Sequence, residues 1–235
     1  MKYSVFSGIQ GEVSKLGFGL MRLPKLYEGK EDIDFEEAER LVDLAYKNGV
    51  NYFDTAYVYH AGESEVFAGK ILNKYPRESY KIATKLPGWV IKNDGKTVDE
   101  LFNEQLEKCE VEYFDFYLFH CLTRKSYPKH KKCNTFEIVK KLKEQGKIKH
   151  IAMSFHDTAD ILDMILSEQP CIEVVQLQIN YLDYDDPAVQ SKACYDVAVK
   201  HGKKVIVMEP VRGGYLVNLP DKAAEVLDNL NGGSY

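Results

Sequence analysis

The chain has 235 residues, 45% of them hydrophobic and 29% charged, which is ordinary for a folded globular protein of one large domain or two small ones. The formal net charge of −5 argues against a general affinity for nucleic acids or anionic membranes. No apolar run approaches the roughly 18 residues of a membrane helix, and the first residues lack the apolar core of a signal peptide. We therefore expect a cytoplasmic protein.

Short apolar runs alternate with amphipathic patterns along the chain. A leading segment, residues 2–14, is expected to form a hairpin. The predicted strands cover residues 16–19, 50–54, 80–85, 114–120, 150–154, 174–178 and 205–209. The predicted helices cover residues 35–48, 64–74, 97–108, 136–144, 158–166, 187–201 and 221–230. The basic run at residues 125–132 is expected to be a solvated loop.

Repeated strand–helix units with nearly continuous apolar strands predict an α/β fold whose parallel sheet is covered on both faces. Gly17 and Gly19 are not followed by the third glycine, or the helix, of a dinucleotide-binding fingerprint. Units of even length without that fingerprint favour a TIM (β/α)8-type barrel over a doubly wound sheet. The leading hairpin would plug the bottom of such a barrel.

A barrel of this type has eight strands, but only seven are predicted here. The residues after Glu209 indicate a loop and one helix, without a further apolar strand. We therefore expect one incomplete barrel domain over residues 1–235, with unpaired edges on its first and last strands. Either the sequence is a piece of a longer protein or another element covers the gap. A homo-oligomer formed through the open edge is one such arrangement.

Titratable residues stand at the ends of three consecutive predicted strands, where TIM barrels carry their function. They are Asp54, Lys85 and His120, and Tyr59 follows Asp54 on the next loop. Each has an ordinary explanation when taken alone, such as a helix cap, a snorkelling lysine or a satisfied core histidine. Four of them at adjacent strand ends favour a catalytic site.

The chemistry of these four groups suits proton transfer. A free tyrosine has a pKa near ~10, and a nearby ammonium lowers it. Lys85 can supply that ammonium, and Asp54 can hold Lys85 through a charge-assisted hydrogen bond. His120 can orient or polarise a substrate carbonyl through its ring N–H.

The sequence resembles the aldo-keto reductases over nearly its whole length, and Asp54, Tyr59, Lys85 and His120 match their catalytic tetrad. In detail it is similar to the bacterial branch that often carries a C-terminal ferredoxin-like iron–sulfur segment. The five cysteines form no CxxC pair, so we expect free thiols, no cluster and no other metal. The segments that carry the resemblance are LGFGLMRLP (16–24), FDTAYVYHAGESE (53–65), IATKLPGW (82–89), DFYLFHCL (115–122), HIAMSFHD (150–157), VVQLQINY (174–181) and VIVMEPVRGG (205–214).

The resemblance implies NAD(P)H-dependent reduction of a small aldehyde or ketone, with Tyr59 as proton donor, Lys85 and Asp54 tuning it, and His120 placing the carbonyl. It favours NADP(H) over NAD(H), and the residues that choose between the two follow the eighth strand in that family. The implied substrate-pocket walls are Tyr57 and Trp89. The implied cofactor-binding residues are Gly19, Met21, Asp54, Ser154, Gln176, Met208, Glu209 and Arg212, with Glu209 expected to pair with Arg212.

Two alternatives of other classes stay open. One is a catalytically inactive, truncated barrel that acts as a binding or assembly module. The other is a metal-dependent TIM-barrel hydrolase that uses His60, His120 and His156, although these histidines lack the HxH or HExxH spacing.

Overall fold

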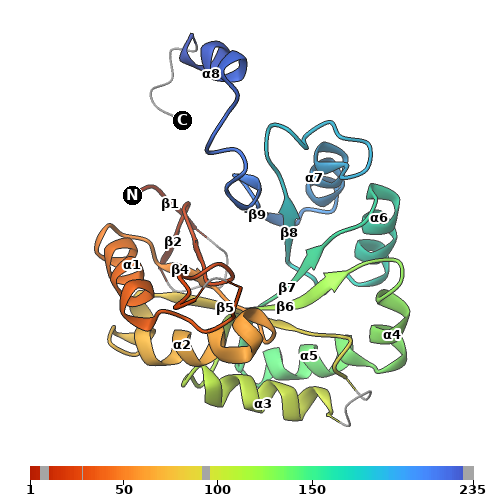
Figure 1. The fold of residues 1–235 in the computed structure, drawn as a ribbon. Coiled ribbons are helices and arrows are strands. Elements are labelled where there is room, and N and C mark those ends of the chain that lie inside the picture. The colour runs from red at the N-terminus through yellow and green to blue at the C-terminus, as the bar shows by residue number, and fades with distance from the viewer. Residues whose placement is uncertain (6–10, 28, 92–95, 230–235) are drawn as a thin grey trace.

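The computed structural model describes residues 1–5, 11–27, 29–91 and 96–229. Its centre is a seven-stranded sheet in which every neighbouring pair is parallel and the strands follow one another in chain order (Figure 1). This order is that of a TIM-type barrel, which confirms the predicted fold class. The strands are β3 (Phe18–Gly19), β4 (Tyr52–Asp54), β5 (Lys81–Leu86), β6 (Phe114–Leu122), β7 (Ile148–Phe155), β8 (Val174–Gln178) and β9 (Lys204–Met208).

The sheet curls but leaves a gap between its first and last strands (Figure 1). Within the described residues, no strand pairs with the outer edge of β3 or of β9. The seven-strand count predicted from the sequence is therefore confirmed. The two open edges face the interior cavity that is described below.

Helices connect the strands and cover the outer face of the sheet (Figure 1). The basic run predicted as a solvated loop contains a short helix, because Tyr127 and His130 turn inward and are buried. The helices are α1 (Phe35–Lys47), α2 (Glu63–Leu72), α3 (Val98–Lys108), α4 (Tyr127–Lys132), α5 (Thr135–Glu144), α6 (Ala159–Glu168), α7 (Ser191–Lys200) and α8 (Asp221–Asp228). The described part of the chain also contains the short 3-10 turns η1 (Tyr59–Gly62), η2 (Arg77–Ser79) and η3 (Arg212–Gly214).

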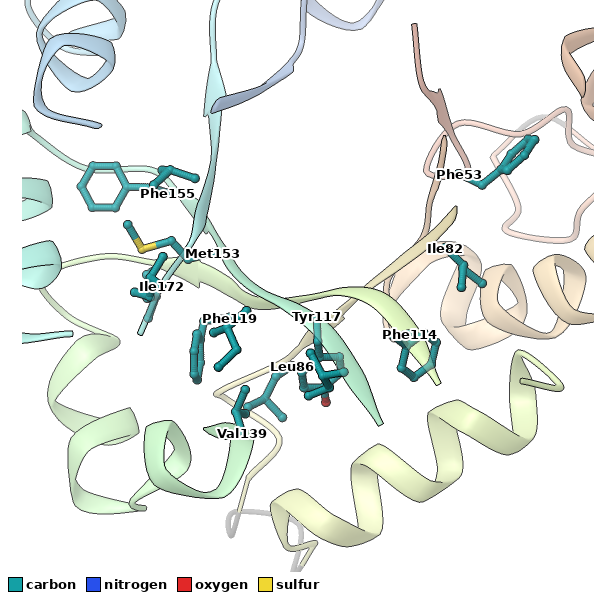
Figure 2. Packing of buried hydrophobic residues seen from close by; sticks show 14 of the residues in the cluster. Phe53, Ile82, Leu86, Phe114, Tyr117, Phe119, Val139, Met153, Phe155 and Ile172 are labelled. Carbon is teal, nitrogen blue, oxygen red and sulfur yellow. The ribbon is translucent and has the colours of Figure 1, made fainter. Parts of the chain in front are cut away.

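The interior strands are buried on both faces, and their side chains alternate between two apolar clusters. In β6, Tyr117 packs in the large cluster between sheet and helices, part of which Figure 2 shows. Its neighbours Phe116 and Leu118 point to the inside of the barrel, where they join a smaller cluster with Tyr52. Burial on both faces explains the continuous apolar runs in the sequence.

The predicted N-terminal hairpin is present as β1 (Tyr3–Val5) paired antiparallel with β2 (Glu12–Ser14). Val13 is buried in the interior cluster, beside residues at the beginnings of strands. The side chain of Asn51, just before β4, accepts from Ser14 N at 2.7 Å and donates to Glu12 O at 2.8 Å. The hairpin is thereby fixed at the bottom of the barrel, as the sequence predicted.

Helix α8 stands away from the body of the molecule, and none of its residues is buried (Figure 1). Among the helices that the structure describes, none combines the length and the apolar character needed to cross a membrane.

Candidate active site

The structure brings the predicted tetrad together at the carboxyl ends of β4, β5 and β6. Asp54 is the last residue of β4, Lys85 is the penultimate residue of β5, and His120 lies near the end of β6. In the parallel ladder, Asp54 is opposite Ala83, and Lys85 is opposite Leu118. The three polar groups are thus staggered by two residues from strand to strand, and all of them lie at the carboxyl ends around one mouth.

Lys85 is buried and carries a charge that the surrounding residues compensate. Its side chain is 1% exposed, and its Nζ donates to Asp54 Oδ1 at 2.5 Å and to Thr55 O at 2.7 Å. Burial alone would lower the pKa of Lys85, but the charges of Asp54 and Tyr59 outweigh it and hold that pKa above its ordinary value. The lysine is therefore an ammonium at neutral pH.

Asp54 connects the two sides of the site. While Oδ1 binds Lys85, Oδ2 accepts from Gln176 Nε2 at 3.0 Å and from the hydroxyl of Tyr52 at 3.4 Å. Gln176 belongs to β8, so this bond crosses the interior of the barrel. The carboxylate thus fixes both the lysine and a residue predicted to bind the cofactor.

Tyr59 begins η1 and lies against the lysine and the histidine. Lys85 Nζ is 4.7 Å from the centroid of the Tyr59 ring, and the His120 ring is 6.0 Å from it in an edge-to-face arrangement. Burial raises the pKa of Tyr59, Lys85 lowers it and Asp54 raises it, so that it lies above its ordinary value. Lys85 does lower the pKa of Tyr59, as the sequence predicted. The expectation of a lowered pKa is nevertheless wrong, because desolvation raises this pKa by more than Lys85 lowers it.

His120 is a neutral imidazole at physiological pH. Burial, followed by the charges of Lys85 and His156, lowers the pKa of His120 to about 3. The Trp89 ring lies 5.0 Å from the His120 ring, centroid to centroid. The predicted pocket residue Trp89 is therefore next to the tetrad.

The loop that carries Tyr59 has an unusual backbone. His60, Ala61 and Gly62 all have positive φ values, of 50°, 54° and 99°, a region that residues with side chains seldom occupy. The buried His60 ring stabilises this turn, because its Nε2 accepts from Leu23 N at 3.1 Å and its Nδ1 lies 3.2 Å from Glu31 O.

A cavity of about 670 Å³ opens beside the tetrad, between β3 and β9. Its walls include Asp54 and Tyr59 at the mouth, and Tyr52 and Phe116 farther inside. The predicted cofactor residues that line it are Gly19, Met21, Asp54, Gln176, Met208 and Glu209. Ser154 lies behind them in β7, opposite Gln176 in the ladder, and its Oγ accepts from Cys121 N at 2.8 Å.

The predicted pairing of Glu209 with Arg212 is wrong. Glu209 Oε1 is 2.7 Å from the Nη1 of Arg22, which follows β3, so this ion pair spans the gap between the two edges of the sheet. Arg212 is instead 3.7 Å from Asp183 Oδ1. Arg22 lines the cavity and was missed from the sequence, although its position three residues after the end of β3 was a usable signal.

The structure places Tyr57 apart from the cavity. Its hydroxyl donates to Glu104 on α3 at 3.2 Å, and Lys96 Nζ donates to that hydroxyl at 3.2 Å. Tyr57 is absent from the cavity walls formed by the described residues. As a substrate-pocket wall it remains a prediction from the resemblance alone.

Among the three histidines of the hydrolase alternative, His120 and His156 lie close enough for their charges to interact, but His60 does not join them. The His60 ring serves the loop described above, and His120 contacts Tyr59 and Trp89. Across residues 1–5, 11–27, 29–91 and 96–229, no group of three or more His, Cys, Asp or Glu side chains is arranged to hold a metal ion.

Comparison with known proteins agrees with this geometry. A curated relative, a probable aldo-keto reductase 1 from Glycine max, is 36% identical over 155 residues, which are 63% of this chain and 43% of the relative. The chain thus matches less than half of that relative's length.

Solved structures of aldo-keto reductases share the fold. A holo form from Bacillus halodurans matches with a TM-score of 0.72 and 25% identity over 94% of this chain and 71% of that chain. One from Klebsiella pneumoniae in complex with NADP and acetate has a TM-score of 0.69 and 20% identity over 94% and 73% of the two chains. The model of the Aldo/keto reductase family matches residues 15–230. The chain therefore belongs to the aldo/keto reductase family.

Proposed function

We propose that the protein reduces a small aldehyde or ketone to an alcohol with NAD(P)H as hydride donor. The observation that carries this proposal is the buried Lys85 ammonium held by Asp54 against the ring of Tyr59, at the mouth of a cavity large enough for a small-molecule site. This is the arrangement that a proton donor for a developing alkoxide requires.

The residues on the cavity wall fit the nicotinamide half of a dinucleotide. Met21 and Met208 offer polarizable surface for a flat ring. Gln176 uses its Nε2 for Asp54, which leaves Oε1 to accept from a carboxamide, and we assign Ser154 to the same group. We assign Gly19, Glu209 and Arg212 to the remainder of the cofactor, with NADP(H) preferred to NAD(H). When bound, the cofactor supplies a hydride to the carbonyl carbon.

Tyr59 supplies the proton in this proposal. Its raised pKa keeps the phenol protonated at neutral pH, so that it can donate to the carbonyl oxygen as that oxygen gains charge. Lys85 then stabilises the phenolate until solvent returns the proton. The neutral His120 donates one ring N–H to the same oxygen and holds it beside Tyr59. The products are the alcohol and the oxidised cofactor.

The test is a titration with NADPH and with NADH, followed by nicotinamide fluorescence, together with carbonyl-dependent oxidation of the cofactor. Tyr59→Phe should bind the cofactor like the wild type but lose roughly 10²–10⁴-fold in turnover. Tyr195→Phe is the matched control, because Tyr195 lies on α7 and is 41% exposed. Equal turnover of Tyr59→Phe and the wild type would refute the role of Tyr59.

The inactive barrel remains as a second proposal, because β3 and β9 offer unpaired edges within the described residues. It requires self-association or capture of another strand without turnover of any carbonyl. Cofactor binding together with turnover would exclude it. The cytoplasmic location is likewise proposed from the sequence alone.

A further inference from the structure

A buried carboxyl group lies behind the strand that carries Lys85. Glu65 of α2 is fully buried, and its Oε1 accepts from Thr84 Oγ1 at 2.5 Å and from Gln105 Nε2 at 2.7 Å. Thr84 precedes Lys85 in β5, and Gln105 lies on α3. The cluster therefore joins two helices to the outer face of β5, on the opposite side from the tetrad.

The cluster reaches Lys85 through its backbone. Gln105 Nε2 also donates to the carbonyl oxygen of Lys85 at 3.0 Å, and the hydroxyl of Tyr117 donates to Gln105 Oε1 at 2.7 Å. Tyr117 is one of the residues on the helix-facing side of the sheet in Figure 2. The amide of Gln105 is thus held in one orientation, with the Lys85 carbonyl, Glu65 and the Thr84 hydroxyl as its acceptors.

The same helix carries Tyr59 into position. Helix α2 begins at Glu63, directly after η1, so Glu65 is six residues from Tyr59 on one continuous segment. At Gly69, a Cβ would lie 2.5 Å from the carbonyl oxygen of Lys108, which shows how closely α2 approaches α3. Glu65 therefore connects the segment that presents the proton donor to the strand that presents the ammonium.

The surroundings of Glu65 favour the neutral form of its carboxyl group. Its Oε2 is buried without a hydrogen-bond partner among the described residues, and a carboxylate left half-partnered in the core is costly. Burial raises the pKa of Glu65 to about 7 against the bonds from Thr84 and Gln105. The other titratable groups that face it are Lys108 and Glu104 from α3, Cys109 directly after α3, and Tyr117 from β6.

We propose that Glu65 is a positioning residue whose neutral carboxyl fixes the distance between Tyr59 and Lys85. This role rests on the proposed reduction, but the geometry that it controls can be measured without turnover. Loss of the carboxyl removes the bonds that join the Thr84 side chain and Gln105 to α2. Helix α2 and the Tyr59 loop then shift relative to Lys85, so the phenol moves relative to the ammonium. Misplacement of this kind costs catalysis roughly 10–100-fold.

Three variants separate positioning from bulk stability. Glu65→Gln keeps an oxygen for Thr84 and Gln105 and mimics the neutral acid, whereas Glu65→Ala removes both acceptor bonds. Glu63→Gln is the matched control, because Glu63 is an exposed residue in the first turn of the same helix. Circular dichroism establishes which variants fold.

The first readout is the pKa of Tyr59, followed by NMR of tyrosine labelled at the phenolic carbon, with Tyr59→Phe assigning the signal. Tyr59 titrates above its ordinary value, at a pH where the wild-type Glu65 is already ionised. Because Lys85 lowers the pKa of Tyr59, Glu65→Gln, which stays neutral, should have a lower Tyr59 pKa than the wild type, while Glu63→Gln should match the wild type. An unchanged Tyr59 pKa in a folded Glu65→Gln would overturn the proposal. This readout decides the matter even if the wild type turns over no carbonyl, which would instead refute the proposed function.

The second readout is the pH profile of kcat. Above pH 7 the wild type gains a buried carboxylate, so its kcat should fall there, while that of Glu65→Gln should remain level. Glu65→Ala should lose roughly 10–100-fold in kcat, with KM little changed. If Glu65→Ala does not fold, identical alkaline limbs for wild type and Glu65→Gln overturn the proposal by themselves.

Discussion

Replacing Asp54 by asparagine tests how strongly the fold depends on compensation of the Lys85 charge. The substitution keeps the size and one oxygen of the side chain but removes its negative charge. Lys85 is only 1% exposed, so its ammonium cannot turn to solvent when the carboxylate is lost. The remaining partner is the carbonyl oxygen of Thr55, at 2.7 Å.

The size of the effect follows from the distance and the burial. With unit charges 2.5 Å apart and an effective dielectric constant of ~20, the pair interaction is about 7 kcal/mol. The asparagine oxygen recovers about 1–2 kcal/mol of this as a hydrogen bond. Removing one partner of a buried pair typically costs about 3–5 kcal/mol. We therefore expect the unfolding free energy of Asp54→Asn to fall by about 4 kcal/mol at pH 7.

The loss should shrink as the pH rises. In the wild type, folding raises the pKa of Lys85. Lys85 therefore contributes its full stabilisation when the pH is below its pKa in the unfolded chain, and this contribution is lost as the pH rises through its pKa in the folded protein. In Asp54→Asn the desolvation remains without the carboxylate, so the folded pKa of Lys85 falls below the unfolded one. Between these two pKa values, the unfolded state of the variant binds more protons than its folded state. The unfolding free energy of the variant therefore increases with pH in this range.

Urea unfolding at pH 7 and pH 9, followed by circular dichroism and by Trp89 fluorescence, measures both effects. Asp196→Asn is the matched control, because Asp196 pairs with Lys192 where both side chains are more than half exposed, and it should change stability immeasurably. Asp54→Asn combined with Lys85→Met should recover most of the loss. Equal destabilisation by both aspartate substitutions, or a loss that grows toward pH 9, would refute the reasoning.

Two further predictions concern the open side of the barrel. Glu209→Gln removes the carboxylate beside the assigned cofactor and frees the guanidinium of Arg22, so the cofactor should bind a few-fold more tightly at low salt, whereas Arg22→Ala should weaken it. Fluorescence titration of both variants at two salt concentrations checks this, and weaker binding in both would contradict it. The unpaired edges of β3 and β9 predict a homo-oligomer, which light scattering at two protein concentrations tests. A monodisperse monomer at both would exclude it.

The strand ends of the site could be predicted because the relevant signals are local. An apolar run that stops at Asp54, Lys85 or His120 marks both a buried strand and the polar group at its mouth, and parallel connectivity then places the three together. The seven-strand count follows from the same patterning.

What could not be predicted depends on side-chain direction and on long-range pairing. Glu209 has a positive φ of 56°, and its ion pair with Arg22 joins residues 187 positions apart. Tyr57 lies two residues before Tyr59, yet its hydroxyl reaches Glu104 on α3. The pKa of Tyr59 likewise depends on how deeply packing buries its ring as well as on the nearby charges. The sequence predicted only the effect of Lys85 on this pKa.

The position of each residue in the sheet separates the proposed catalytic geometry from the proposed cofactor binding. Asp54, Lys85 and His120 lie on strands that are paired on both sides, so their mutual distances are fixed by two ladders each. Arg22 and Glu209 instead follow the two edge strands, and their ion pair is a direct link across the gap. Disturbing the edges should therefore weaken cofactor affinity before it alters the Tyr59–Lys85 arrangement. Because the charge of Arg22 lowers the pKa of Tyr59 by less than that of Lys85 does, Arg22→Ala should raise the Tyr59 pKa only slightly while it weakens cofactor binding. A rise as large as that caused by removing Lys85 would contradict this argument.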